Sequence, residues 1–267
     1  PKHTPTLHSL IKIPNAATIN FDVHRIMISA YKLQLRYKIH SNTMVSSSTI
    51  SMLIGMLDLI EGQDWNKLEY IAQTEPKTYQ FLSKSITLCD EFNGMTLLHA
   101  CVRFHPPIKV LDLMIKLYPQ ALSVEDCLGR TPLHVAAGSR ASPWIMKVLT
   151  VNYPQACDIQ DEDGRTPLHF SCDAACELFE DDDCVSRGPP SLDTIRVLLS
   201  GSLGAVTVED FDERNAVEYA IMSDARIDVI KLLQKASQMV MRQMEVKSSS
   251  RTSFSMSSMA RVRVLHC

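Results

Sequence analysis

One stretch of this chain occurs three times, and it constrains the fold more than any other feature. Each copy holds a glycine, a threonine two residues later and a histidine three residues after that. The glycines stand at 94, 129 and 164, so successive copies begin 35 residues apart. A fixed period of about 20 to 50 residues indicates a repeat architecture, in which each unit buries its apolar face against its neighbours. The repeated residues are Gly94, Thr96 and His99; Gly129, Thr131, Pro132 and His134; and Gly164, Thr166, Pro167 and His169.

The residue types within one copy predict a turn followed by two helices. Gly129 supplies the backbone freedom of a tight turn. Thr131 is suited to cap a helix through its hydroxyl, and Pro132 to occupy the first helical position, where the missing N–H costs nothing. A Ser-Pro turn follows, and a second apolar stripe then predicts a second helix. That stripe consists of Val110, Leu113 and Met114 in the first copy, Ile145, Val148 and Leu149 in the second, and Ile195, Leu198 and Leu199 in the third.

The Thr-Pro-Leu-His core at this period resembles the ankyrin-repeat family, and the resemblance covers about residues 89 to 235. It implies an all-α solenoid of stacked helix–turn–helix units with short β-turn fingers, flanked by tails of low order. It also implies that the protein recognises other proteins through its finger tips and the concave face of its first helices. No cofactor, metal or small-molecule substrate is expected from it.

The expected organisation places whole repeats between two capping units. Equivalent positions of the motif are 35 residues apart from His134 to His169, but 49 residues apart from His169 to Glu218. The third unit therefore carries an insertion. The expected units are 1–49, a basic N-terminal segment; 50–88, an N-terminal helical capping repeat; 89–123 and 124–158, two repeats; 159–207, a repeat with an acidic loop insertion near 176–190; 208–237, a degenerate C-terminal capping repeat; and 238–267, a helix extension with a Ser-rich tail.

Three segments outside the motif carry weaker expectations. Residues 31–40 alternate apolar and polar side chains, so the first 49 residues are either a poorly ordered tail, a short hairpin docked on the first repeat, or sequence outside the folded domain. Pro76 is expected to end the N-terminal capping unit. A last helix is expected to reach about Val246, and the Ser-rich run from Lys247 to Ser258 is expected to be disordered.

Charge is distributed unevenly along the chain. Residues 50–236 hold 16 Lys and Arg against 28 Asp and Glu, a net charge of −12, whereas residues 1–49 carry +5 and residues 237–267 carry +4. An acidic body argues against nucleic acid as the ligand of the repeats. The leading hypothesis is therefore a non-catalytic adaptor or scaffold for an unidentified protein with a partly basic surface. The alternative from another class is a tether to a membrane surface or to nucleic acid through the basic residues 21–40.

The resemblance also assigns candidate partner-binding residues. Phe92, Leu128 and Phe211 are apolar at positions expected to be exposed, where each is either a contact anchor or packed on the neighbouring finger. The full set comprises the finger tips Glu91, Phe92, Cys127, Leu128, Asp161, Glu162, Phe211 and Asp212, and the concave-face residues Val102, Arg103, Ser139, Arg140, Asp173 and Ala174.

Several histidines and cysteines are candidates for a catalytic or metal site. Stacked helices lie about 8 to 10 Å apart, too far for the three motif histidines to share one zinc ion, so each is expected to form hydrogen bonds within its own turn. His169, Cys172, Cys176 and Cys184 could make a zinc site, but Cys172 stands where Ala137 stands and is better explained as a small buried residue. No nucleotide-binding or hydrolase motif is present, so no enzyme is expected. The third hypothesis, after the adaptor and the tether, is a metal-dependent enzyme that uses the cluster from His169 to Cys184. Unpaired cysteines and the absence of an evident signal peptide or apolar span favour a cytoplasmic or nuclear protein.

Overall fold

The computed structural model describes residues 46–89, 92–176, 178 and 189–262, with side chains up to residue 246. These residues form helices and short turns, with one isolated β-bridge between Glu209 and Asn215, so the predicted all-helical stack is confirmed. The first helices of the units are α3 (Ser47–Glu61), α6 (Leu97–Arg103), α8 (Pro132–Gly138), α10 (Pro167–Cys172) and α12 (Ala216–Met222); the second helices are α4 (Trp65–Thr74), α7 (Ile108–Leu117), α9 (Pro143–Asn152), α11 (Leu192–Gly201) and α13 (Ile227–Val262).

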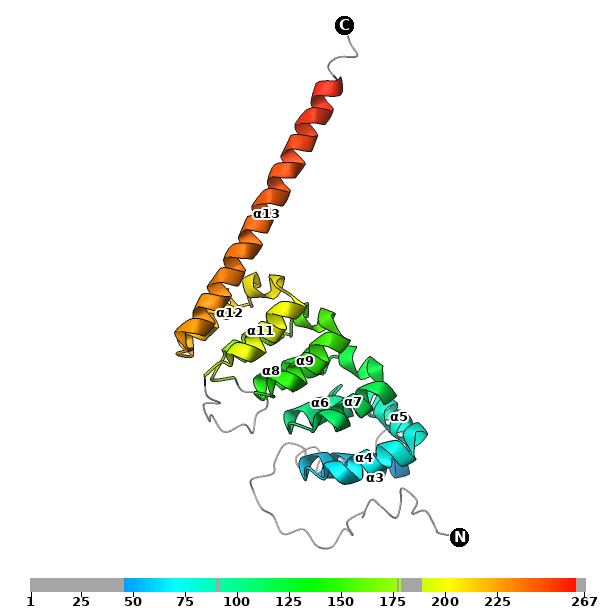
Figure 1. Cartoon of the computed structure of the whole chain (residues 1–267). Helices are drawn as coiled ribbons and strands as arrows, with labels where there is room; N and C mark the ends of the chain where they lie inside the picture. The colour runs from blue at the N-terminus through cyan, green and yellow to red at the C-terminus, as the bar shows by residue number, and fades with distance from the viewer. Residues whose placement is uncertain (1–45, 90–91, 177, 179–188, 263–267) are drawn as a thin grey trace, which may run out of the picture.

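The units stack so that each helix contacts its equivalent in the next unit. First helices pack in the order α3, α6, α8, α10, α12, and second helices pack in the order α4, α7, α9, α11, α13 (Figure 1). Short 3₁₀ turns follow three of the second helices and lead into the next finger. These turns are η3 (Pro119–Ser123), η4 (Pro154–Asp158) and η5 (Gly204–Thr207).

The N-terminal unit holds one more helix than the sequence indicated. Ser46 caps α3, and Asp64 caps α4 by accepting from the Lys67 N–H at 3.2 Å. Pro76 does not end the unit. It occupies the first turn of α5 (Pro76–Ser85), which packs on α4 and α7 and leads into η1 (Ile86–Leu88). A proline suits a helix start as well as a helix end, because the first N–H of a helix has no intrahelical partner. Residues 1–45, including the alternating 31–40 segment, lie outside the described residues.

The third unit resumes its register after the insertion. Ser191 caps α11 as Ser142 caps α9, and these two caps are 49 residues apart. The buried residues of α11 are therefore Thr194, Ile195 and Leu198, in the positions of Val110, Leu111 and Met114 in α7. The order of the apolar stripes in the sequence matched Leu199 to Met114. In the structure Leu198 takes the position of Met114, so the expected match was wrong by one residue. Of the insertion near 176–190, the structure describes Cys176, Leu178, Pro189 and Pro190.

The last helix is much longer than its counterparts. Val229, Leu233, Ala236 and Val240 bury one side of α13 against the stack, and the helix then projects beyond it (Figure 1). The Ser-rich run expected to be disordered lies within this helix. Nucleation is the costly step in helix formation. The turns of α13 that pack on the stack provide the nucleus, so each further residue only extends an existing helix.

Candidate functional site

Three of the fingers are each built on an aspartate at the base. Oδ1 of Asp126 accepts from the N–H groups of Leu128 and Arg130, each at 2.9 Å. Asp161 bonds Asp163 and Arg165 in the same way, at 3.1 and 2.7 Å, and Asp210 does so with Asp212 and Arg214. These bonds close the turn, which ends in a repeated glycine after Asp126 and Asp161 and in Glu213 after Asp210. Asp161 is therefore a buried structural residue, 7 % exposed, and its assignment to a finger tip was wrong.

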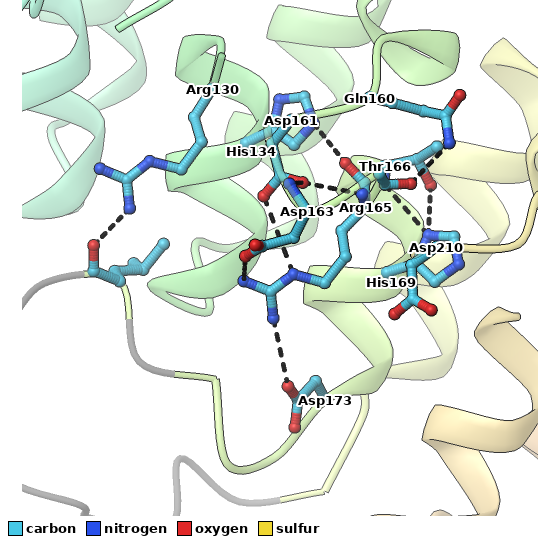
Figure 2. A network of polar contacts seen from close by, with 12 residues as sticks. Arg130, His134, Gln160, Asp161, Asp163, Arg165, Thr166, His169, Asp173 and Asp210 are labelled. Atoms are coloured by element: carbon cyan, nitrogen blue, oxygen red, sulfur yellow. Dashed lines mark hydrogen bonds and ion pairs between the residues drawn. The ribbon is translucent and has the colours of Figure 1, made fainter. Parts of the chain in front are cut away.

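In two of these fingers an arginine side chain holds the aspartate from within the same finger. Arg130 donates from Nε and Nη2 to Oδ2 of Asp126, at 2.9 and 2.8 Å, and both side chains are buried. Arg165 lies 3.8 Å from Asp161 and also from Asp173 (Figure 2). Its guanidinium stacks 4.5 Å from the Phe170 ring centre. Burial raises the pKa of Asp161, although the N–H and charge of Arg165 oppose that shift.

In the last finger a tyrosine hydroxyl takes the place of the arginine side chain at the aspartate. Tyr219 donates its hydroxyl to Oδ2 of Asp210 at 2.6 Å. Burial alone would raise the pKa of Asp210, but the hydrogen bonds from Tyr219 and from the Arg214 and Asp212 N–H groups bring it below its ordinary value. Tyr219 stands at the position of Phe170 in the repeat. The base of each finger is thus fixed, so its tip is held in one place.

Neighbouring fingers are joined through their backbones. The Cys127 N–H donates to the Asn93 carbonyl at 2.7 Å, and the Glu162 N–H donates to the Leu128 carbonyl at 2.9 Å. The Phe211 N–H donates to the Asp163 carbonyl, also at 2.9 Å. The tips consequently form a continuous, rigid strip rather than separate loops. We call this strip the finger row and define it as Cys127, Leu128, Glu162, Asp163, Phe211 and Asp212.

The finger row is acidic and carries two exposed apolar side chains. Leu128 is 43 % exposed and Phe211 is 77 % exposed, the latter with its ring beside Gly164. The carboxylates of Glu162, Asp163 and Asp212 are exposed around them. Phe92 does not belong with them: it is 2 % exposed and packs in the N-terminal core, so its expected contact role was wrong. Glu91 lies outside the described residues.

The motif histidines connect the layers of the stack. Nδ1 of His99 accepts from the Thr96 N–H at 3.1 Å, so Nε2 carries the proton and donates to the Arg130 carbonyl of the next finger at 2.9 Å. His134 and His169 make the same pair of contacts, reaching the carbonyls of Arg165 and Arg214 at 3.2 Å. The predicted hydrogen bond within each histidine's own turn is present, and its partner is the N–H of the capping threonine. The bond to the following repeat was missed, because sequence spacing does not show which groups meet across two layers.

Burial keeps these imidazoles neutral. It lowers the pKa of His99 to about 4 and that of His134 to about 3, and it also lowers the pKa of His169. A neutral, fully bonded imidazole in the core has no lone pair free for a metal and no access to a substrate. The histidines are structural.

The concave face of the first helices offers less binding surface than expected. Val102 is fully buried, and Arg103 is half-buried with its guanidinium 5.7 Å from the Phe104 ring centre. Arg140 donates to the carbonyls of Ser171 and Asp173 in the next unit. The remaining expected residues, Ser139, Asp173 and Ala174, are half-buried, and each contributes a backbone group to a hydrogen bond between units.

The start of the insertion covers part of this concave face. Leu178 is 2 % exposed, and a Cβ placed on Gly138 of α8 would lie only 2.6 Å from the leucine side chain. Arg130 donates from Nη1 to the Leu178 carbonyl (Figure 2). Cys176 is buried beside it. These contacts leave the finger row as the more accessible of the two expected surfaces.

The cysteines and histidines do not assemble a metal site in the described part of the chain, where no three His, Cys, Asp or Glu side chains are grouped to hold an ion. Cys184 lies outside that part. Cys172 is fully buried, and burial raises the pKa of its thiol to about 12. Among the described helices, none combines the length and apolar character needed to cross a bilayer.

Two residues of the site could have been identified from the period alone. Asp126 and Asp161 are 35 residues apart, like the motif glycines, and a repeated aspartate points to a structural role. The same step assigns Asp163 to the position of Leu128 at a tip. Alignment of the fingers by the repeat period therefore distinguishes residues at the base of a finger from residues at its tip. Assignment of tip residues by their charge alone does not make this distinction.

Comparison with known proteins agrees with this architecture. Residues 114–171, from within α7 to within α10, match a family model described as ankyrin repeats (many copies). None of the curated proteins compared with the chain matches it. Proteins with ankyrin repeats are typically non-catalytic and generally serve to bind other proteins. The repeated motif, the stack of helix pairs and this match together identify residues 114–171 as ankyrin repeats.

Proposed function

We propose that this protein is a non-catalytic adaptor or scaffold that binds a partner through its finger row. The observation that carries the proposal is a rigid acidic strip with Leu128 and Phe211 exposed among Glu162, Asp163 and Asp212. Exposed aromatic and aliphatic side chains surrounded by charge are typical of contact anchors. The partner that fits is a protein surface with basic side chains around an apolar recess.

Charge supports a basic partner at longer range as well. Residues 50–236 carry a net charge of −12. Such a field steers a basic partner toward the acidic body and raises its association rate, an effect that weakens as salt is added. Because cysteines such as Cys101, Cys157 and Cys172 are unpaired, we place this binding in a reducing compartment, cytoplasmic or nuclear.

Affinity capture with two matched double variants tests the proposal. The finger variant combines Phe211→Ala with Glu162→Lys. The control combines Trp144→Ala with Asp193→Lys on the second helices, where Trp144 is 69 % exposed and Asp193 is also exposed. Asp161 is not a suitable test residue, because its substitution would open the turn.

We expect wild type and control to retain the same partner, and the finger variant to lose it. We also expect about 0.5 M salt to release it, since screening at that ionic strength confines electrostatic attraction to a few ångströms. A partner that the finger variant retains would contradict the finger-row assignment. Retention at high salt would contradict the electrostatic part.

A further inference from the structure

Lysine is confined to one kind of element in the repeat unit. Between residues 50 and 236 every lysine lies in a second helix or in α5. Over that range the second helices and α5 hold nine Lys and Arg against four Asp and Glu, a net charge of +5. The rest of residues 50–236 carries −17. Charge is therefore divided within each unit, with the acidic finger row on the turns and a basic surface on the second helices.

The middle second helix, α9, exposes a large apolar side chain among these cations. Trp144 is 69 % exposed, and Val151, two turns further along α9, is 68 % exposed. Lys147 lies between them on the same side of the helix, with its Nζ 5.7 Å from the Trp144 ring centre. Tryptophan is among the residue types that contribute most to binding energy at protein interfaces. Helix α9 therefore presents an aromatic anchor with a cation beside it.

The helices on either side of α9 add further cations. Helix α9 packs between α7 and α11, and the three lie side by side (Figure 1). Lys109 and Lys116 of α7 each stand 35 residues, one repeat, before an exposed apolar residue of α9. Arg196 of α11 stands 49 residues after Lys147, the same step as between the caps of α9 and α11. We call this exposed surface the helix face and define it as Lys109, Lys116, Trp144, Lys147, Val151 and Arg196.

Ion pairs within the stack engage two of the four cations of the helix face. Lys109 lies 2.6 Å from Glu69, and Arg196 lies 3.2 Å from Asp193. Lys116 and Lys147 are exposed and belong to no such pair among the described residues. The two lysines nearest the apolar side chains in the repeat are therefore available to carboxylates of a partner.

Acidic neighbours favour a protein over a lipid bilayer as the ligand. Asp193 stands in α11 where Trp144 stands in α9. Asp112 stands in α7 where Lys147 stands in α9. An anionic membrane would bring its headgroups against these carboxylates as well as against the lysines. A protein segment carries carboxylates only at particular positions, so it can pair with the lysines without approaching either aspartate.

We propose that the helix face binds an acidic protein segment in which carboxylates surround an apolar side chain. The apolar side chain would rest against Trp144 and Val151, and the carboxylates would meet Lys116 and Lys147. The finger row belongs to the turns and not to the second helices, so both surfaces can be occupied together. The protein would then join a basic partner to an acidic one. Only this joining rests on the proposed function, and binding at the helix face does not.

An acidic model peptide tests the helix face. The probe is a fluorescein-labelled peptide of glutamates with a leucine at every third or fourth position, which places the leucines on one side of a helix. At about 16 residues its helix is about 24 Å long, enough to cross three helices packed about 8 to 10 Å apart. We expect saturable binding by fluorescence anisotropy at low salt. No binding of the peptide up to about 1 mM would overturn the proposal.

Two matched charge reversals locate the peptide. Lys116→Glu with Lys147→Glu alters the helix face, and we expect it to weaken binding at least about tenfold. Lys231→Glu with Lys235→Glu makes the same charge change on α13, two layers from α9. We expect this control to bind like wild type, because its separation of about 16 to 20 Å exceeds the Debye length of about 10 Å. Equal weakening in both variants would show attraction by net charge alone and would overturn the proposal. Circular dichroism checks that each variant is folded.

The two proposals fail separately. The finger variant leaves the helix face unchanged, so it should bind the peptide as wild type does. The variant Trp144→Ala with Asp193→Lys leaves the finger row unchanged, so it should still retain the finger-row partner. If the finger variant no longer bound the peptide, the contact would lie at the finger row and the assignment to the helix face would be wrong.

Tryptophan fluorescence identifies the contact itself. The chain holds two tryptophans, so Trp65→Phe leaves Trp144 as the reporter. We expect the unlabelled peptide to shift the Trp144 emission to shorter wavelength, because the ring leaves water. Binding without this shift would contradict the role of Trp144. Vesicles of phosphatidylserine and phosphatidylcholine provide the last comparison: a shift caused by the vesicles and not by the peptide would identify a bilayer as the ligand and overturn the proposal.

Discussion

At the scale of single residues, the histidine that gives the sequence its most chemical appearance is a structural connector. Its two ring nitrogens face different layers: Nδ1 of His134 accepts from Thr131, and Nε2 donates to carbonyls of the next unit. Both roles require the neutral ring. Protonation would place a hydrogen on Nδ1, which must accept, and would put a charge in the core.

Acid should therefore destabilise the fold through these histidines. The unfolded chain takes up protons below about pH 6.5, the ordinary histidine pKa, whereas folded His99 and His134 resist protonation down to about 4 and about 3. Stability is present above about pH 6.5 and falls as pH decreases, by up to about 1.4 kcal/mol per pH unit for each histidine. Urea denaturation at pH 7.5, 6.0, 5.0 and 4.5, values chosen to span roughly that window, measures this loss.

His134→Gln isolates one contribution to that loss. Glutamine at this position can still accept from the Thr131 N–H, because glutamine serves in the same capping arrangement. It does not titrate, so we expect lower stability at pH 7.5 but a shallower decline with acid. A variant with the slope of wild type would show that His134 does not govern the acid response.

At the scale of elements, three of the fingers contain a glycine in a conformation that other residues disfavour. Gly129 has a φ of +71°, and a Cβ there would lie 3.3 Å from the Asp161 backbone of the next finger. The turn geometry and the close approach of two fingers therefore both require it. In the last finger Glu213 takes this position at a φ of +60°, where no further finger is described beside it.

Gly129→Ala should destabilise the protein by about 1 to 2 kcal/mol, the cost of a left-handed backbone for a residue with a Cβ. Gly204→Ala is the matched control, because Gly204 lies in η5 with its nearest neighbour 3.7 Å from an added Cβ and no positive φ. We expect Gly204→Ala to be neutral or slightly stabilising. Denaturant midpoints of both variants measure the difference, and equal midpoints would contradict the role assigned to Gly129.

At the scale of the whole molecule, two apolar clusters adjoin within one stack. The N-terminal cluster runs from Ile50 to Met114 and includes Phe92, and the larger one runs from Met95 to Val240. Helices α6 and α7 contribute to both clusters. Because each unit contacts mainly its neighbours, stability should vary along the stack instead of being shared equally.

Hydrogen exchange should reveal this gradient. Leu68 is fully buried in the N-terminal cluster, so Leu68→Ala should remove about 2 to 5 kcal/mol. We expect amide protection to fall most in α3, α4 and α5 and least in α10 and α11. Val229→Ala, in the other cluster, should produce the opposite pattern. A uniform loss of protection in both variants would instead indicate one fully cooperative unit.

Local chemistry that repeats in the chain was readable without a structure. A glycine turn, a capping threonine and an apolar helix stripe are each set by neighbouring residues, so the fingers, the helix pairs and the 14-residue excess of the third unit follow from the sequence. The repeat period is also sufficient to assign Asp161, like Asp126, to the base of a finger. These features depend on contacts within one unit or on its exact recurrence.

Tertiary structure decided what depends on contacts between units. Whether Phe92 faces solvent or the core, and which carbonyl His99 reaches, are set by how one layer sits on the next. The same holds for Leu178, which lies over α8 far from it in sequence, and for Ile221, which is exposed because the described residues form no layer beyond it. A sequence period fixes what each layer is made of, while burial is determined by the neighbour that each layer meets.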